Sequence, residues 1–417
     1  MESKRVVVTG LGAITPIGNN TNDFWEGLVN GKNGACEITR FDSTLFKTHF
    51  ACEVKGYNPD DYFDKKTARK YDLFAQFDII AADEAIADSG ISPENTDYDD
   101  VGVMLTSGIG GVNHFYNEVM EYSKTDLVPR FSPFLITKMI ANMPGGVISI
   151  KYGFRGPNYA TVSACASSAH AVIDAFDYIR FGKSKVIVAG GAGAAIGVCG
   201  IGGFNAMKAL STRNDDFMTA SRPFDLNRDG FVMGEGAGSL VLEEYEHAMA
   251  RGAKIYAEVV GGGASADAYH ITAPHPEGKG GVLSMKRALT DAGISPEAID
   301  HINTHGTSTP MGDVAEPIAI KEVFGEHAYN IGINSTKSMT GHLLGGAGAV
   351  EAIATILALK NGIIPPTINH FDDDPQIDNR LDFTFNKAKK RDIKYALTNS
   401  FGFGGQNATL IFKKFES

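Results

Sequence analysis

The chain has 417 residues, 43% hydrophobic and 21% charged, which is typical of a globular protein with two packed halves. Its net charge of −11 argues against a general nucleic-acid binder, and no apolar stretch is long enough to cross a membrane. The four cysteines share no CxxC spacing and the first residues lack a secretory apolar region, so we expect no disulfide framework, no zinc site and a cytoplasmic location.

Short β-rich runs alternate with helical patterns along the chain. We expect strands at 5–10, 101–108, 185–191, 237–245 and 254–262, and amphipathic helices at 71–90, 167–182 and 280–293. This alternation predicts an α/β fold with buried sheets.

The first strand run leads into GLGAITPIG at 10–18, which looks at first like a dinucleotide-binding turn. Thr15 stands where the third glycine of such a turn belongs, and Pro16 interrupts the helix that should follow. No acidic ribose-binding residue follows a second strand at the expected distance. We therefore expect no dinucleotide site.

The next unusual segment is DKKTARKYD at 64–72, which gathers Lys65, Lys66, Arg69 and Lys70. Taken alone, such a cluster is most often a solvated charged face. In a chain with a net charge of −11, a compact basic cluster is also able to steer an acidic partner. Both interpretations stay open at this point.

Cys165 lies in TVSACASSAH at 161–170, between an extended run and a helical pattern. A lone cysteine is usually a small buried hydrophobe. The expected place at a helix N-terminus would instead favour the thiolate, and a backbone N–H at a sharp turn there is able to bind an oxyanion. Cys165 is therefore either a filler or a nucleophile.

Two internal echoes indicate a duplicated α/β half. IADSGISPEN at 86–95 and LTDAGISPEA at 289–298 share D-[SA]-G-I-S-P-E, each after a helical pattern and before a strand-like segment. More loosely, TVSACASSAHAVIDA and SMTGHLLGGAGAVEAI each place a reactive residue ahead of a helix rich in small residues. We expect an N-terminal half at 1–252 with the cysteine and a C-terminal half at 253–417 with two histidines.

His305 lies in NTHGTSTPMGD at 303–313, at a predicted strand end. Gly306 and three hydroxyl residues follow it, which suits a hydrogen-bonding site, although a satisfied loop histidine fits equally well. His301 and His305 have the spacing of a metal pair, but no third ligand is evident and the segment is not helical. We therefore expect no metal.

His342 lies in NSTKSMTGHLLGGAGAVEAI, at a predicted helix start. An imidazole there is biased toward its neutral form, which suits hydrogen bonding to a developing enolate. The helix that follows is apolar nearly all round and holds one carboxylate, Glu351, for which Lys337 is the expected partner. The alternative is a Glu351 side chain at the surface.

The segment NSFGFGGQN at 399–407 is a glycine-rich turn with two phenylalanines. It is either a tight hairpin that packs Phe401 and Phe403 into the core, or a mobile loop. In the second case an aromatic side chain gates a pocket and a backbone N–H completes an oxyanion hole.

Together these motifs resemble the β-ketoacyl-acyl-carrier-protein synthases, the condensing enzymes of fatty-acid synthesis, over essentially the whole chain. The segments that carry the resemblance are SACAS at 163–167, NTHGTSTPMGD at 303–313, STKSMTGHLLGGAGAVEA at 335–352 and SFGFGGQN at 400–407. TSGIGG, GIGGFNAMKALSTR and SRPFDLNRDGFVMGEGAG look like the synthase II branch. The resemblance implies a thiolase-like fold, with two pseudo-duplicated βαβαβαββ halves in five α-β-α-β-α layers, and usually a homodimer.

The resemblance also implies an acyltransferase that elongates fatty acids by decarboxylative Claisen condensation, without a cofactor. Cys165 would take the acyl chain from an acyl carrier protein, and the N–H groups of Cys165 and Phe403 would hold the oxyanion. His305 and His342 would stabilise the enolate formed from malonyl-carrier protein.

Supporting roles follow from the same resemblance. They are Lys337 ordering the site through Glu351, Asp267 and His270 as site support, Phe403 as a gate with Phe401 behind it, Thr307, Thr309 and Thr272 for the phosphopantetheine arm, Ile109 and Phe204 for the acyl pocket, and Lys66, Arg69, Lys70, Arg130 and Lys208 for the acidic carrier protein. Two positions depart from the usual pattern. Gln406 replaces a common Thr in the gating loop, and Lys208 stands where Arg is usual, which loses bidentate geometry.

Three other functions remain as alternatives. A polyketide ketosynthase has nearly the same motifs. A non-catalytic partner of the same fold, such as a chain-length factor, typically lacks the nucleophile, whereas Cys165 is present here. A cysteine hydrolase is disfavoured by two histidines without an obvious orienting Asp or Asn.

Overall fold

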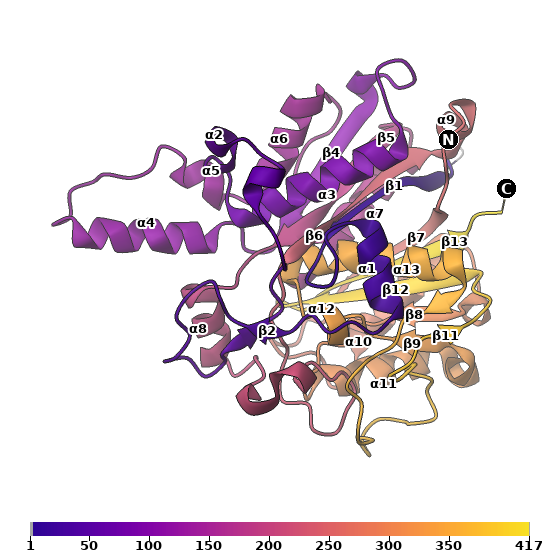
Figure 1. Ribbon diagram of the computed structural model, residues 1–417. Coiled ribbons are helices and arrows are strands. Elements are labelled where there is room, and N and C mark those ends of the chain that lie inside the picture. Colours follow the sequence, from indigo (N-terminus) through magenta and orange to yellow (C-terminus); the bar gives the residue numbers. More distant parts are fainter. Residues whose placement is uncertain (1–2, 417) are drawn as a thin grey trace.

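The computed structural model describes residues 3–416. Its main strands are β1 (Val6–Ile14), β4 (Val101–Ser107), β5 (Val186–Gly193), β6 (Gly236–Glu244), β7 (Ala257–Ala266), β8 (His301–Asn303), β9 (Gly332–Asn334), β12 (Tyr395–Gly402) and β13 (Gln406–Lys414). They form one sheet in the order β4-β5-β6-β1-β7-β13-β12-β8-β9, in which β1 and β7 join the two halves (Figure 1).

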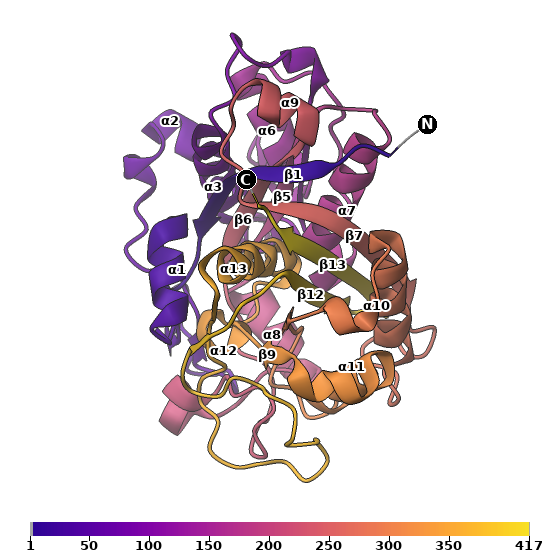
Figure 2. The same ribbon diagram turned by 90° about the vertical axis from the view of Figure 1, so that its right-hand side faces the viewer.

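The two halves of this sheet and the helices packed on them form five layers. The main helices are α3 (Leu73–Ser89), α6 (Met143–Tyr152), α7 (Ser167–Arg180), α10 (Lys279–Ala292), α11 (Gly312–Phe324) and α13 (Ala347–Asn361). Helices α7 and α13 contact each other and lie between the two halves of the sheet, whereas α3 and α6 cover one outer face and α10 and α11 the other (Figure 2). This is the α-β-α-β-α arrangement that we predicted.

The two halves repeat one chain path. The N-terminal half runs β1-α3-β4-α7-β5-β6, and the C-terminal half runs β7-α10-β8-α11-β9-α13-β12-β13. The counterpart of β9 in the N-terminal half is reduced to one parallel bridge, between Val103 and Asn158. The predicted duplication is confirmed. We propose the boundary at 252/253 because it lies between α9 (Tyr245–Ala250) and β7.

Glycines let the outer helices pack directly on both halves of the sheet. A Cβ on Gly12 in β1 would lie 1.9 Å from the carbonyl oxygen of Ala81 in α3, and one on Gly263 in β7 would lie 2.1 Å from that of Ser284 in α10. This packing also explains why β1 continues to Ile14, past the strand end that we predicted at residue 10. Residues 10–14 of the glycine-rich segment are therefore buried strand, and a tight turn closed by the Thr15–Gly18 bridge follows them.

The remaining elements surround this framework. They are α1 (Thr21–Val29), α2 (Lys65–Ala68), α4 (Val112–Lys124), α5 (Leu135–Met139), α8 (Val198–Ala206), α12 (Lys337–Thr340), and the short strand pairs β2 (Cys36–Glu37) with β3 (Phe50–Ala51) and β10 (Ile363–Ile364) with β11 (Lys389–Lys390). Helix α4 projects from the body of the molecule (Figure 1). Within residues 3–416, no helix has the length and apolar character needed to cross a membrane.

Candidate active site

A cavity of about 330 Å³ brings together residues from both halves of the chain. Cys165 comes from the turn before α7, His305 from the loop after β8, and His342 from the turn before α13. Phe401 and Phe403 enter from the hairpin between β12 and β13. The cavity therefore brings together residues as far apart in the sequence as Cys165 and Phe403, which are separated by 238 positions.

Cys165 lies in a one-turn 3-10 helix, Ala164–Ala166, that leads directly into α7. Ala164 has a φ of +50°, which is strained for a residue with a side chain. The thiol is buried, and burial raises its pKa to about 11 against the opposing effects of Lys337 and nearby N–H groups. Desolvation therefore opposes the thiolate that a helix N-terminus favours, and it has the larger effect on the pKa of this thiol.

Backbone donors converge on the cysteine sulfur. The N–H groups of Phe403 and of Cys165 itself stabilise negative charge there. Gly402 makes this approach possible, since a Cβ at that position would lie 2.7 Å from the Ser163 carbonyl oxygen. Two fixed N–H donors beside a nucleophile are the arrangement that stabilises an oxyanion.

The rings of His305 and His342 lie with their centroids 5.3 Å apart and nearly perpendicular, at 88°. Burial lowers both pKa values well below the usual range, and the Lys337 ammonium lowers them further. Both rings are therefore neutral, as predicted for His342, although burial contributes more than the helix start. His301 points elsewhere, with its Nε2 2.9 Å from Asn334 Oδ1.

Lys337 and Glu351 form a buried ion pair behind the cavity. The predicted pairing is confirmed, and the alternative of a surface Glu351 is wrong. Burial raises the pKa of Glu351 to about 7, against the effect of Lys337. Because neither residue lines the cavity, the pair acts on the histidines through its charge and through the packing of α12 and α13.

Two carboxylates of α11 were missed from the sequence. Glu316 accepts hydrogen bonds from the backbone N–H groups of His305 and Gly306, both at 2.9 Å, and from Asn399 Nδ2 at 3.1 Å. Asp313 accepts the N–H of Ser308 at 3.1 Å. A carboxylate in a mostly buried helix was the available signal, the same one that pointed to Glu351.

The two phenylalanines of the hairpin are half-buried and face the cavity. The Phe401 ring lies 5.7 Å from that of His305, and the Phe403 ring lies 6.1 Å from that of Phe204. The alternative in which both pack into the core is wrong. Their place beside the reactive groups is compatible with gating, which stays a prediction.

Most of the predicted rim residues line the same cavity, namely Thr272, Thr307, Thr309, Asp267, Phe204 and Lys208. The hydroxyls of Thr307 and Thr309 lie 3.0 Å apart, and Asp267 accepts a 2.8 Å hydrogen bond from Asn407. His270 does not line the cavity and accepts the N–H groups of Thr272 and Ala273. Ile109 is also absent from the lining and is exposed in the single chain.

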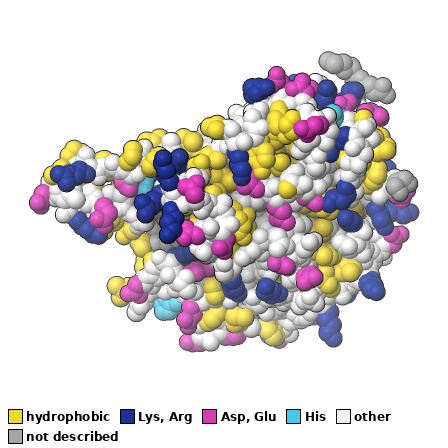
Figure 3. Space-filling model, turned by 45° about the horizontal axis from the view of Figure 1, so that its top comes forward, with side chains coloured by type: hydrophobic (Ala, Val, Ile, Leu, Met, Phe, Trp, Pro, Cys, Tyr) yellow, Lys and Arg dark blue, Asp and Glu magenta, His cyan; other side chains and the backbone are white. Residues whose placement is uncertain are grey.

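The basic cluster lies on α2 and the residues after it. Lys66 and Arg69 are exposed and Lys70 is half-buried. Arg130 is exposed in the connection between α4 and α5. Figure 3 shows Lys and Arg side chains grouped near the base of the α4 projection, on the face that carries α2. The cluster is thus an accessible surface.

Two family models match this chain: "Beta-ketoacyl synthase, N-terminal domain" over residues 3–248 and "Beta-ketoacyl synthase, C-terminal domain" over residues 256–371. The chain belongs to the beta-ketoacyl synthase family. A curated member from Synechocystis sp., named 3-oxoacyl-[acyl-carrier-protein] synthase 2, is 49% identical over 420 residues, with all of this chain and 99% of the relative covered. A protein of the same name from Staphylococcus aureus is 49% identical over the full length of both chains. The resemblance to the synthase II branch is thereby confirmed.

Solved structures confirm the fold of this family member. A beta-ketoacyl synthase from Burkholderia phymatum is 35% identical with a TM-score of 0.92, covering 99% of this chain and all of the other. A type II polyketide ketosynthase, solved with its acyl-carrier protein and bound to the hexaketide, is 34% identical with the same TM-score and the same coverage. The ishigamide ketosynthase/chain length factor is 35% identical with a TM-score of 0.91.

Proposed function

We propose that this chain is a 3-oxoacyl-[acyl-carrier-protein] synthase that elongates fatty acids by decarboxylative Claisen condensation. The observation that carries the proposal is the cavity in which Cys165, with two N–H donors at its sulfur, lies with the neutral His305 and His342. The two full-length relatives at 49% identity support the fatty-acid pathway.

The first half-reaction is the transfer of an acyl chain to Cys165. The sulfur attacks the acyl thioester, and the N–H groups of Cys165 and Phe403 hold the oxygen of the tetrahedral intermediate. The carrier thiol then leaves with the proton that the cysteine thiol loses. Burial raises the pKa of the free thiol to about 11, and the N–H groups of Phe403 and Cys165 oppose this rise by stabilising negative charge at the sulfur.

The second half-reaction uses the two histidines. Their neutral rings donate hydrogen bonds to the thioester oxygen of the malonyl group, which carries the negative charge once carbon dioxide leaves. The resulting carbanion attacks the acyl-enzyme carbonyl, and the bond to sulfur breaks. The Cys165 sulfur leaves as a thiolate and takes up a proton from solvent, and the β-ketoacyl thioester departs. Burial, with the positive charge of Lys337 as a smaller contribution, keeps the rings of His305 and His342 neutral, so that each ring has one N–H to donate to the enolate oxygen.

The proposed partner is an acyl carrier protein. The exposed Lys66 and Arg69, with the half-buried Lys70 beside them, form a basic surface that suits an acidic protein, and Lys208 lines the cavity. Thr307 and Thr309 face the cavity, where they would bind the phosphopantetheine arm. The structure of the related polyketide ketosynthase with its own carrier protein supports such a partnership.

We also propose a homodimer. The segment beside β4 continues the sheet only through the Val103–Asn158 bridge, and Tyr159 and Val162 beyond it are exposed, which leaves an open strand edge. Helix α4 also exposes apolar side chains, and Figure 3 shows hydrophobic surface on this projection. Ile109 would then be covered by the second copy. Light scattering measures the mass, and a monomer would contradict the proposal.

The decisive experiment is intact mass measurement after mixing the protein with a medium-chain acyl-carrier protein, followed by peptide mapping. We expect one acyl group on the peptide that contains Cys165, which malonyl-carrier protein then discharges as a β-ketoacyl product. Cys199→Ala, which removes the exposed cysteine, serves as the control and should acylate normally. A folded protein that takes up no acyl group would favour a non-catalytic partner of the same fold. Discharge only into extended polyketide chains would favour the polyketide alternative.

A further inference from the structure

The loop that carries Thr307 and Thr309 is held by groups outside the cavity. Its middle residue, Ser308, has a φ of +70°, a strained value for a residue with a side chain. The Ser308 N–H donates to both Asp313 carboxylate oxygens at 3.1 Å. Its hydroxyl accepts the N–H of Arg222 at 3.0 Å, and its carbonyl accepts the N–H of Gly230 at 3.1 Å. The strained residue therefore depends on a segment about 80 residues earlier in the chain.

The same segment contributes Arg228, whose side chain is only 3% exposed. The guanidinium donates from Nη2 to the Pro310 carbonyl at 2.8 Å and from Nε to the Thr309 carbonyl at 3.2 Å. Its Nη1 donates to the Asp225 carbonyl at 2.8 Å and to Asp374 at 2.7 Å. Arg228 thus fixes the two peptide units that follow the Thr309 side chain.

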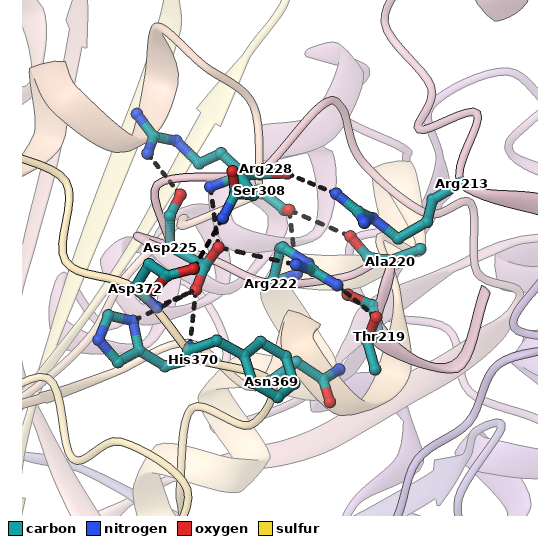
Figure 4. A network of polar contacts seen from close by, with 12 residues as sticks. Arg213, Thr219, Ala220, Arg222, Asp225, Arg228, Ser308, Asn369, His370 and Asp372 are labelled. Atoms are coloured by element: carbon teal, nitrogen blue, oxygen red, sulfur yellow. Dashed lines mark hydrogen bonds and ion pairs between the residues drawn. The ribbon is translucent and has the colours of Figure 1, made fainter. Parts of the chain in front are cut away.

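Charge and neighbouring contacts hold the guanidinium in this place. Figure 4 shows Arg228, Ser308, Arg222 and Asp225 within one polar network. The Asp225 carboxylate accepts the N–H groups of Phe371 and Asp372, at 2.7 and 2.9 Å, and so ties the segment that contains Asp374 to the same cluster. Because Arg228 does not line the cavity, it touches neither substrate nor reacting groups.

From these contacts we infer that Arg228 is a positioning residue for binding of the phosphopantetheine arm. It keeps the loop in the strained conformation that turns the hydroxyls of Thr307 and Thr309, 3.0 Å apart, into the cavity. The inference rests on the proposed function, since it assigns the arm to these threonines. Loss of Arg228 weakens binding of substrates that carry the arm and leaves the chemistry at Cys165 intact.

The test compares three malonyl donors with Arg228→Met: malonyl-carrier protein, malonyl-pantetheine, and malonyl-N-acetylcysteamine, which lacks most of the arm. We expect KM to rise about tenfold for the first two, which is the effect of losing roughly one hydrogen bond to the arm, with little change in kcat. KM for the third should stay near the wild-type value. Arg228→Lys, which keeps the charge but not the fork of donors, should give an intermediate result.

Arg251→Met is the matched control. Arg251 is also buried and donates two hydrogen bonds, at 2.7 and 2.6 Å, but to Glu243, far from this loop in the chain. We expect it to lower stability without changing the ratio of KM values between the long and short donors. Equal losses on all three donors, or a ratio shift in the Arg251 variant as well, would overturn the positioning role. If the wild-type protein condenses none of the three donors with an acyl-enzyme, the proposed function fails instead.

Discussion

The helices α7 and α13 begin in nearly the same way, one in each half of the chain. Each follows a one-turn 3-10 helix whose first residue has a positive φ despite its side chain, +50° at Ala164 and +52° at Leu344. The next residue differs: it is Cys165 before α7 and Gly345 before α13. The duplication thus built two equal turns, of which only one carries a thiol.

Packing explains why the two turns cannot exchange roles. A Cβ on Gly345 would lie 2.1 Å from the backbone nitrogen of Gly108, at the end of β4. The turn before α13 is therefore pressed against the other half, whereas the turn before α7 opens into the cavity with the Cys165 side chain. What the C-terminal half contributes instead is His342, three residues ahead of Gly345. One turn makes the nucleophile and the other makes a donor for the enolate.

The largest effect should follow removal of the one thiol in this comparison. Cys165→Ala should reduce condensation by about 10⁴-fold or more, because it removes a nucleophile for which the cavity has no substitute. Decarboxylation of malonyl-carrier protein should persist, since His305 and His342 remain. The measurement is product formation and carbon dioxide release in parallel, and condensation at more than a trace level would exclude Cys165 as the nucleophile.

His342→Ala tests the other turn. We expect decarboxylation and condensation to fall by about 10²–10³-fold, the usual cost of one lost donor to a developing negative charge. Acylation of Cys165 should continue, because its oxyanion donors are backbone N–H groups. Intact mass follows the acyl-enzyme while carbon dioxide release follows the second step. Equal losses in both steps would show that His342 also serves acyl transfer.

Gly345→Ala makes the two turns more alike and should be costly in stability. The added Cβ collides with backbone that cannot move without displacing β4, so we expect the free energy of unfolding to fall by about 3 kcal/mol. The control is Gly203→Ala in the exposed face of α8, where a Cβ would meet nothing within 4 Å. Helix propensity predicts a gain of about 0.5–1 kcal/mol there. Chemical denaturation measures both, and a stable Gly345 variant would contradict the packing argument.

The sequence was sufficient for the fold and for the reactive groups, since Cys165, His305 and His342 each stand at the junction of a strand or loop with a helix, where local patterns are informative. It was not sufficient for the residues that hold them. Glu316 accepts hydrogen bonds from backbone N–H groups at His305, and Arg228 donates to carbonyls about 80 residues away in the chain. No local sequence pattern predicts either role. The raised pKa of Cys165 could not be predicted from the sequence for the same reason, because burial is a property of the assembled halves.

The outer helices offer a second comparison between the halves. In the C-terminal half, the Ser284 hydroxyl of α10 has two hydrogen-bond partners, the Gly263 carbonyl oxygen and, at 2.7 Å, the Thr409 hydroxyl. The Thr409 hydroxyl in turn donates to Asn399 at 2.8 Å. Thr409 pairs with Gly263 as Ser239 pairs with Gly12 in the N-terminal half. There the Ser239 hydroxyl has no hydrogen-bond partner among the described residues.

Asp78 of α3 is a buried polar residue of the N-terminal half that destabilises the fold more than Ser239 does. Both of its carboxyl oxygens are buried without a hydrogen-bond partner among residues 3–416, and burial raises its pKa well above the usual range. The corresponding position of α10 in the C-terminal half is Gly281, three residues before Ser284. Because Gly281 has no side chain, α10 buries no polar group at this position. An unpaired buried carboxyl of this kind is expected to be neutral in the folded protein.

Asp78→Asn should therefore change how stability depends on pH. In the wild-type protein the folded-state pKa of Asp78 lies above the unfolded one. The contribution of this carboxyl to the free energy of unfolding is therefore fully present below pH about 4 and falls by about 1.4 kcal/mol per pH unit as pH rises toward the folded-state pKa. The amide cannot ionise, so the variant should lose this component of the slope. Urea unfolding between pH 5 and 8 measures it, with Asp83→Asn as the control on the same helix, where Lys151 and Tyr152 bind a partly exposed carboxylate. The contradicting result is an Asp78 variant whose free energy of unfolding depends on pH as steeply as that of the wild type, with the Asp83 control also unchanged. The carboxyl of Asp78 would then be paired in solution, and the buried polar groups of both halves would have hydrogen-bond partners.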